Sequence, residues 1–223
     1  MNNLLYTKQE TCPVCQNTFL AMKVRKTKLC KKSQDSDFFT IYEEGIFPFF
    51  YDVYLCPECG YAALETRFHH LTQREKENII KKLSSEWKKR PIPFERNPKD
   101  ALVAYKLALY VAGLKEEKPS QIALLCHRIA WIYRIMEDKS EENRFLENAV
   151  NFYEKAVAEE EINDGIKLFY LIGELNRRLG KENEAARWLA SVITEREKTG
   201  NALLIEMARD SWQKIREKSS NHF

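Results

Sequence analysis

Four of the six cysteines in this 223-residue chain stand in two short pairs that share the pattern Cys-Pro-x-Cys. The pairs are Cys12-Pro-Val-Cys15 and Cys56-Pro-Glu-Cys59. A turn of this kind directs two thiolates toward one point, and backbone N–H groups around it can donate to the sulfurs. Two such turns predict one shared tetrahedral site with Cys12, Cys15, Cys56 and Cys59 as ligands. Four soft, charged ligands suit Zn²⁺, with iron in a rubredoxin-like site as the alternative.

Such a site would organise the fold rather than catalyse a reaction, because four sulfurs leave no open position on the metal for water. The competing interpretation is a thioredoxin-like dithiol, which needs a Cys pair that starts a helix directly after a strand, and neither pair is expected to do so. Gly60 suits the left-handed backbone position after a second ligand, whereas Gln16 follows the first pair and leaves the shape of that turn open.

Other residues could also take part in chemistry. His69 and His70 follow the second pair closely enough for one of them to replace a thiolate or to bond to a ligand. Lysines on both sides of Cys30 could make it a reactive thiol, although a half-buried, inert cysteine is the simpler interpretation. Cys126 and His127 are neighbours in an expected helix and point about 100° apart, which argues against a catalytic pair. We therefore expect no enzyme; an enzyme would need an open metal position or an activated Cys30.

Basic and aromatic residues between the cysteine pairs fit nucleic-acid binding, through phosphate contacts and base stacking. The simpler alternatives are a solvated basic face and an aromatic core. Asp35-Ser-Asp37, which lies between the two groups, is interpreted as turn-forming. The basic residues are Lys23, Arg25, Lys26, Lys28, Lys31 and Lys32, and the aromatic residues are Phe38, Phe39, Tyr42, Phe47, Phe49, Phe50, Tyr51 and Tyr54.

The elements that must position these residues differ between the two halves of the chain. Glycine is scarce, at 7 of 223 residues, which favours helix over a turn-rich β protein. A capping box at Thr72-Gln-Arg-Glu75 predicts a helix that runs to about Trp87. Prolines in the segment 88–98 then exclude helix and predict a linker. Strands are expected at 19–24, continuing toward Leu29, and at 51–55, with a long loop or irregular hairpin at 37–48.

Everything after Pro98 follows a helical period. Three segments, which begin at Ala101, Ala149 and Ala185, carry a small residue at i, a large residue at i+4 and a small or β-branched residue at i+7. These positions share one face of a helix, and the small residues allow another helix to pack closely against it. With a small residue such as Gly173 in the preceding helix, this spacing resembles the tetratricopeptide repeat, and an irregular α-bundle is the alternative. The last helix is interpreted as a terminal cap. Helices are expected at 99–114, 120–137, 141–160, 164–179, 182–198 and 201–217.

The expected fold is mainly α, and α+β overall: a small zinc-ribbon-like β module followed by a tetratricopeptide-repeat-like helical array. We place the metal-binding module at 1–71, a connecting helix and proline-rich linker at 72–97 and the helical domain at 98–223. The net charge of +3 gives no argument for a polyanion partner. No apolar run reaches the roughly 18 residues of a transmembrane helix, and the start lacks the features of a signal peptide, so we expect a cytoplasmic protein with no membrane attachment.

The motifs resemble a family of uncharacterised bacterial proteins, domain of unknown function 2225. The resemblance implies a soluble protein with a metal-binding cysteine region and a repeat-like helical tail, and it implies no reaction. Gln16 and Cys30 depart from the family pattern. The matching residues are Thr11-Cys-Pro-Val-Cys15 with Phe19, Lys23-Val-Arg25, Asp35-Ser-Asp37-Phe38, Tyr51-Asp-Val with Cys56-Pro-Glu-Cys59-Gly-Tyr-Ala62, and Ala208-Arg-Asp-Ser-Trp212.

A closed four-Cys site beside helical repeats predicts a non-enzymatic adaptor or scaffold, whose helical groove binds a protein or peptide partner. A nucleic-acid-binding zinc ribbon that uses the basic segment 23–32 is the alternative, and an enzyme with a metal or reactive-thiol site is the second alternative. The sequence leaves the oligomeric state open. It also leaves open whether the groove is free or filled by the N-terminal module.

Overall fold

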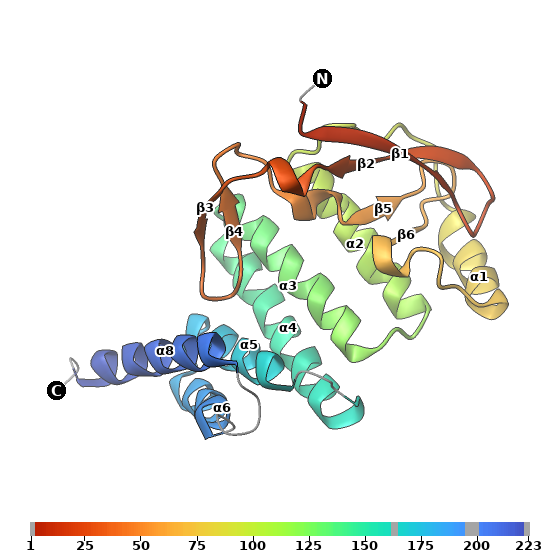
Figure 1. Ribbon diagram of the computed structural model, residues 1–223. Helices are drawn as coiled ribbons and strands as arrows, with labels where there is room; N and C mark the ends of the chain where they lie inside the picture. Colours follow the sequence, from red (N-terminus) through yellow and green to blue (C-terminus); the bar gives the residue numbers. More distant parts are fainter. Residues whose placement is uncertain (1–2, 162–164, 195–200, 221–223) are drawn as a thin grey trace.

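The computed structural model describes residues 3–161, 165–194 and 201–220, in which short β-hairpins precede an array of helices (Figure 1). The described strands form three two-stranded antiparallel sheets, each made by strands adjacent in the sequence. This confirms the expected fold class of a small β region followed by a helical array. The strands are β1 (Leu5–Thr11), β2 (Thr18–Val24), β3 (Lys31–Gln34), β4 (Thr40–Tyr42), β5 (Val53–Leu55) and β6 (Ala62–Leu64).

The strand predicted at 19–24 is confirmed as β2, but its predicted continuation toward Leu29 is wrong. The pairing between β1 and β2 ends where Leu5 faces Val24, so the chain has no strand partner beyond that point. It turns instead through a 3₁₀ helix at Lys26–Lys28. The strand predicted at 51–55 begins later, at Val53, because Pro48 starts a 3₁₀ turn that lasts to Tyr51. The segment 37–48, expected as a long loop or irregular hairpin, contains β4 and the chain after it, whereas the partner strand β3 lies before that segment and was not predicted.

The helix predicted from the capping box is α1 (Gln73–Ile79), which continues as a π-helical turn at Ile80–Ser84. The backbone N–H of Glu75 donates to the Thr72 side chain, and the backbone N–H of Thr72 donates to the Glu75 carboxylate. No helix follows until Asn97, which caps α2 together with Asp100 and places Pro98 in the first turn. Pro98 lacks an amide hydrogen, and none is needed at this position.

The helices of the array begin and end close to their predicted bounds. Pro119 starts one of them, and Gly180, with φ +76°, ends another, as the sequence signals indicate. The predicted start at 164 and the predicted end at 198 lie outside the described residues. The helices are α2 (Pro98–Leu114), α3 (Pro119–Ile135), α4 (Lys139–Glu159), α5 (Gly165–Arg178), α6 (Glu182–Thr194) and α8 (Ala202–Ser220).

Successive helices of the array pack through the small residues that the sequence singled out. Ala101, Ala149 and Ala185 are all fully buried. Gly173 lets α5 approach α6 closely, because a Cβ atom at this position would lie 2.8 Å from Cγ of Leu189. The last helix, α8, packs on α5 and α6 through Leu204 and other apolar residues, as expected of an end cap.

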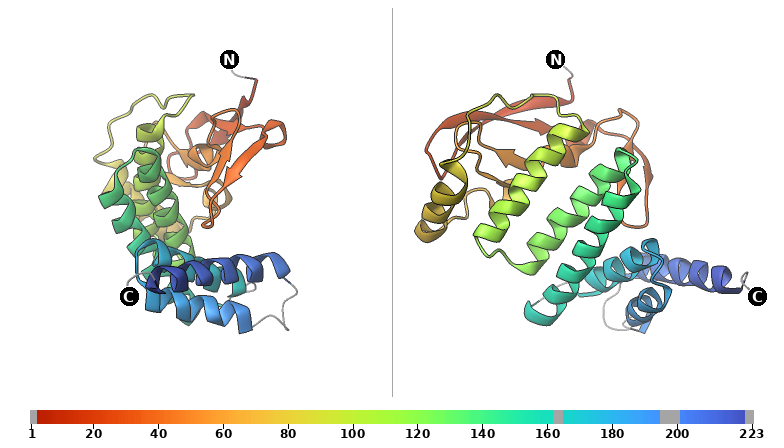
Figure 2. Two further views of the ribbon diagram at one scale, coloured as in Figure 1. Left: turned by 90° about the vertical axis from the view of Figure 1, so that its left-hand side faces the viewer. Right: turned by 180° about the vertical axis from the view of Figure 1, so that it is seen from behind.

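The strands lie on one side of helices α2–α4 (Figure 2). Aromatic side chains belong to the hydrophobic core that strands and helices share. Phe49 is buried with its ring centroid 5.4 Å from that of Trp131 on α3, and its carbonyl accepts a hydrogen bond from Tyr105 on α2. Arg96 donates to the carbonyls of Phe50 and Val53 and so joins the proline-rich segment to the same layer. Most of the aromatic residues of the segment 38–54 are therefore part of the core or pack against it, whereas Tyr42 is half-buried and belongs to none of the described core clusters.

Candidate metal centre

Each Cys-Pro-x-Cys sequence forms the turn of a β-hairpin, the first between β1 and β2 and the second between β5 and β6. The two turns have the same backbone hydrogen bonds. In the first turn, the amide of Gln16 donates to Cys12 O and the amide of Cys12 donates to Asn17 O. In the second turn, the amide of Gly60 donates to Cys56 O and the amide of Cys56 donates to Tyr61 O. The same local pattern thus produces the same turn twice.

The residue after each second cysteine adopts the left-handed conformation, with φ +62° at Gln16 and φ +75° at Gly60. The turn whose shape the sequence left open is therefore the same turn as its glycine-containing counterpart. The Gln16 side chain donates to Pro13 O across the turn, at 3.1 Å. Gln16 in place of a glycine therefore raises the conformational free energy of the first turn without changing its backbone geometry.

The two hairpin turns bring together the four sulfur atoms that the sequence singled out. The Sγ atoms of Cys12, Cys15, Cys56 and Cys59 all lie within 4.8 Å of one another. Cys12 and Cys59 are 3.6 Å apart, as are Cys15 and Cys56. Tetrahedral ligands at about 2.3 Å from a metal are about 3.8 Å from each other. The cluster therefore has the size and the donor chemistry to hold a metal ion.

Three of the four thiols are buried, and the cluster favours a cation electrostatically. Hydrogen bonding with Cys56 raises the pKa of Cys12 to about 12, and hydrogen bonding with Cys12 and Cys56 raises the pKa of Cys59 as well. The pKa of Cys56 falls to about 2 because Cys12, Cys59 and the backbone amides of Cys59 and Glu58 stabilise its thiolate. The sulfurs cannot all ionise beside one another unless a positive charge compensates them. Cys15, the fourth, is exposed.

Trp87 covers the second turn. Its ring lies so close to Gly60 that a Cβ atom there would be 2.5 Å from two ring carbons. The indole N–H donates to Pro57 O at 3.0 Å, and the Arg90 guanidinium stacks 4.4 Å from the ring centroid. The segment that follows the connecting helix, which ends at Ser84 and not at the predicted Trp87, is thereby attached to the cysteine turn.

The two histidines considered as ligands have other contacts. His69 Nε2 lies 3.0 Å from a carboxylate oxygen of Glu10, a buried residue of β1. His70 is exposed, and its carbonyl accepts a hydrogen bond from Lys115. Of the other two cysteines, Cys30 is exposed with its amide bonded to Glu44, and Cys126 is buried, which raises its pKa to about 12.

The six basic residues considered for nucleic-acid contacts do not share one strand. Lys23 lies on β2 and forms an ion pair with Glu65, while Lys26, in the 3₁₀ helix after β2, pairs with Asp52. Lys28 bonds to Asn3 and Arg25 stacks on Tyr6. Lys31 and Lys32 follow on β3, where both are exposed.

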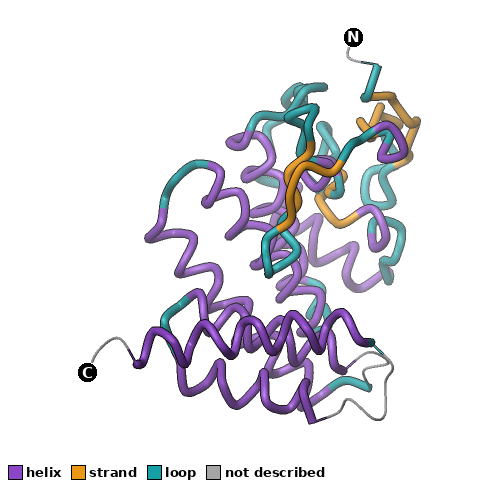
Figure 3. The backbone as a smooth tube through the Cα atoms, turned by 60° about the vertical axis from the view of Figure 1, so that its left-hand side comes forward, coloured by secondary structure: helices purple, strands orange, loops and turns teal. Residues whose placement is uncertain are grey.

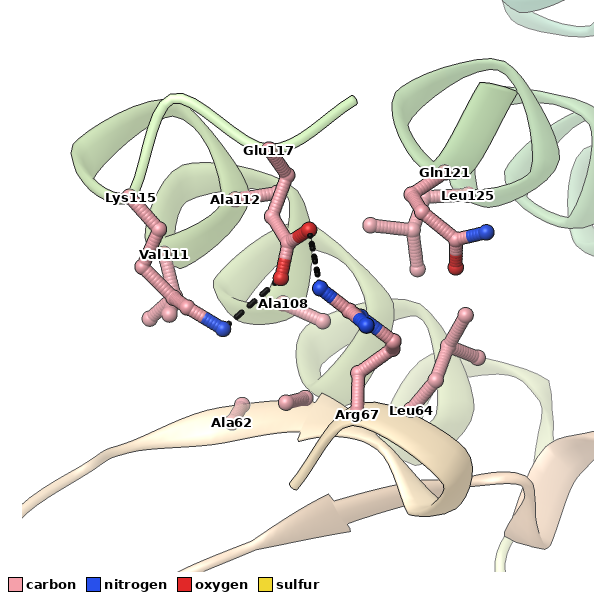
Figure 4. A pocket seen from close by; sticks show the side chains of 11 residues that line it. Ala62, Leu64, Arg67, Ala108, Val111, Ala112, Lys115, Glu117, Gln121 and Leu125 are labelled. Atoms are coloured by element: carbon pink, nitrogen blue, oxygen red, sulfur yellow. Dashed lines mark hydrogen bonds and ion pairs between the residues drawn. The ribbon is translucent and has the colours of Figure 1, made fainter. Parts of the chain in front are cut away.

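A small cavity lies between β6, α2 and α3 (Figure 4). Glu117 bridges Arg67 and the buried Lys115 at its edge, with N···O distances of 3.0 and 2.7 Å. The space open to a water-sized molecule is only about 20 Å³. This is room for about one water molecule, far below the several hundred Å³ of a ligand pocket.

A second polar site was not predicted from the sequence. Asp35-Ser-Asp37 does form a turn, in which the amide of Phe38 donates to Asp35 O. However, Asp37 is fully buried and accepts hydrogen bonds from Trp131 and Arg134 of α3. Burial would raise the pKa of Asp37, but hydrogen bonds from His127 and Arg134 outweigh it and hold this pKa well below its usual range. The hairpin therefore reaches into the helical array.

The fold and the cysteine cluster together define a class of protein. In this class, β-hairpins that carry a four-cysteine cluster able to hold a metal ion pack against a helical array. A family model described as "Uncharacterized protein conserved in bacteria (DUF2225)" matches residues 5–215. The chain belongs to this family. No curated protein and no solved structure matches the chain. None of the helices in the described ranges is long and apolar enough to cross a membrane.

Proposed function

We propose that the four-cysteine cluster is a structural zinc site. The observation that carries this proposal is the convergence of four sulfurs from two equivalent turns, at separations close to those around a tetrahedral zinc ion. Four thiolates complete the coordination of zinc, so the ion would join the β1–β2 hairpin to the β5–β6 hairpin. A reducing compartment such as the cytoplasm would keep the thiols available to the metal.

The test is the metal content of the purified chain, with X-ray absorption to count sulfur neighbours. One zinc per chain with four sulfurs is expected. Cys59→Ser should lose most of the metal, whereas Cys30→Ser, which alters an exposed cysteine outside the cluster, should retain it. Iron in the same four-sulfur shell would assign the rubredoxin-like alternative, and a metal-free chain with four titratable thiols at the cluster would refute the site.

We further propose that the protein is an adaptor or scaffold, in which this zinc site holds the N-terminal hairpins against a helical array that binds a protein partner. The support is the architecture: helix pairs stack side by side, with small residues such as Gly173 at their contacts and a helix packed on the end. Stacked helix pairs of this kind are tetratricopeptide-like and create extended surfaces that suit protein segments.

The adaptor proposal is tested in two steps. Proteins captured from a bacterial lysate by the zinc-loaded full chain are identified, and each candidate is then purified and titrated against the chain. Saturable binding of a purified partner supports the proposal. Independent captures that return no protein able to bind the purified chain would refute it.

A further inference from the structure

The turn of the β3–β4 hairpin, residues 35–38, is here called the acidic tip. The hairpin extends from the N-terminal region toward α5 and the other C-terminal helices (Figures 1 and 3). At its end Asp37 accepts hydrogen bonds from Arg134 at 2.7 Å and from Trp131 at 3.0 Å, and His127 lies 3.4 Å away. Asp35 forms a further ion pair with Arg134, at 2.9 Å.

The helices contribute a matching set of side chains, here called the cradle. On α5, the hydroxyl of Tyr170 donates to Ser36 O, and Glu174 accepts a hydrogen bond from the Ser36 hydroxyl. Arg178 lies 3.3 Å from Asp37 and 3.5 Å from Asp35. The cradle consists of His127, Trp131 and Arg134 of α3 with Tyr170, Glu174 and Arg178 of α5.

The charges of the cradle require an acidic occupant. When the tip is left out of account, cations outnumber carboxylates here, because Glu142 pairs with Arg134 and Lys139 and Glu174 pairs with Arg177 and Arg178. The indole N–H of Trp131 would lose its acceptor as well. Buried donors without an acceptor are costly, so this surface favours a segment that brings carboxylates.

The hairpin that carries the tip has little support of its own. All side chains of β3 are exposed, and β3 and β4 form a two-stranded sheet of four and three residues. Isolated hairpins of this size are marginally stable in water, so the hairpin depends on what its tip binds. Phe38 in the tip has φ +67°, a strained conformation that its contact with Tyr170 helps to maintain.

We infer that the cradle is a recognition site for an acidic protein segment, and that the acidic tip is its resident occupant. A partner segment would need a small residue with one carboxylate on each side of it, followed by an aromatic side chain. Such a segment would compete with the tip. The inference rests on the proposed adaptor function and adds the location and chemistry of its partner site. Because the tip fills the cradle, the N-terminal region occupies this part of the helical array.

Competition from within the chain determines how the site must be tested. A tethered segment acts at an effective concentration of about millimolar, so a free peptide competes poorly with it. Phe39, next to the tip, is also buried against Trp131 with ring centroids 5.5 Å apart, which holds the hairpin further. The cradle must therefore be freed of its own tip before binding is measured.

The experiment titrates a fluorescent peptide that copies residues 33–40 into the zinc-loaded full chain, its Asp37→Ala variant and an Asp37→Ala, Arg178→Ala double variant. The peptide should bind Asp37→Ala about tenfold or more tightly than wild type, and Arg178→Ala should remove about the same factor. A control peptide with both aspartates replaced by asparagine should bind weakly. Equal binding of both peptides, or none to a folded Asp37→Ala variant, would overturn the inference.

If Asp37→Ala fails to fold, Asp35→Ala is used instead, because Asp35 is part-exposed and its loss removes the ion pairs with Arg134 and Arg178 and so weakens the hold of the tip on the cradle. Failure of the peptide to bind this variant better than wild type would then overturn the inference. Light scattering tests the remaining alternative, in which the tip of a second copy of the chain occupies the cradle. A dimer of the wild-type chain that the Arg178→Ala variant cannot form would support that alternative and overturn the inference.

The outcomes separate this inference from the adaptor proposal. A purified partner that binds wild type, Asp37→Ala and Arg178→Ala equally well would support an adaptor and overturn the cradle as its site. Peptide binding that follows the pattern above, in a chain for which no partner is found, would support the cradle and leave the adaptor proposal refuted by its own test.

Discussion

Replacement of Gly60 by alanine tests how Trp87, in the segment after the connecting helix, is packed on the second cysteine turn. Two costs are expected. The left-handed conformation at φ +75° costs an alanine roughly 1–2 kcal/mol. The new Cβ would also lie 2.5 Å from two ring carbons of Trp87, which cannot move away without loosening its hydrogen bond to Pro57 O. Overpacking of this kind costs about 1–3 kcal/mol.

Gly45 provides the matched control. Its φ is +67°, and no neighbouring atom of the described chain lies within 4 Å of the position that its Cβ would occupy. Gly45→Ala should therefore incur the conformational cost alone. The difference between the two variants isolates the contact with Trp87, and we expect Gly60→Ala to be less stable than Gly45→Ala by about 1–3 kcal/mol.

The assay is urea-induced unfolding of the zinc-saturated chains, followed by circular dichroism. With a slope of about 2 kcal/mol per molar urea, the expected difference corresponds to midpoints about 0.5–1.5 M apart. Adding Trp87→Leu should remove part of the difference, since the two positions are in contact. Coincident midpoints for the two alanine variants would refute the idea that Trp87 holds the second turn.

Three further outcomes are expected. Chelation should lower the melting temperature of wild type and of Cys30→Ser, and added zinc should restore both; an unchanged melting curve would contradict a structural metal. Gln16→Gly should stabilise the zinc-loaded chain by about 0.5–1 kcal/mol in urea unfolding, because it relieves a left-handed non-glycine residue, whereas destabilisation would show that the Gln16 side chain matters more. The pKa of Asp37 is depressed by the fold, so its carboxylate contributes stability that is complete above its unfolded pKa of about 3.9 and is lost as the pH falls below it. Asp37→Asn should cost about 3 kcal/mol near neutral pH and flatten the loss of stability as the pH falls below about 3.9, whereas a wild-type acid slope in that variant would contradict the assignment.

The sequence predicts best those features that depend on neighbouring residues. Pro119 and Gly180 mark a helix start and a helix end by local geometry, and the structure begins α3 at Pro119 and ends α5 just before Gly180. The Cys-Pro-x-Cys turns are also local. Gln16 shows that the pattern of the turn decides its shape, because the same hydrogen bonds form without the glycine that makes the conformation easy.

The features that the sequence did not predict depend on contacts between distant residues. Asp37 is 97 residues from Arg134 and 94 residues from Trp131, and no local pattern connects them. Arg134 and Arg178 look like solvated helix positions in the sequence, whereas in the structure they are largely buried by the tip. The short strand β3 has no apolar alternation, because all four of its side chains face solvent. Such a strand is defined by its partner and by what its turn contacts.

The metal centre and the cradle are connected through the chain that runs between them. Cys15 and Cys56 are 41 residues apart, and the segment that they bound carries the β3–β4 hairpin. A metal ion shared by the two turns would close this segment into a loop, while β5 and β6 hold its far end against α2. Closing a loop reduces the conformational freedom of everything within it. A bound metal would therefore keep the acidic tip at a high local concentration near its cradle, so that the four-cysteine cluster stabilises the contact between hairpin and helices without touching it.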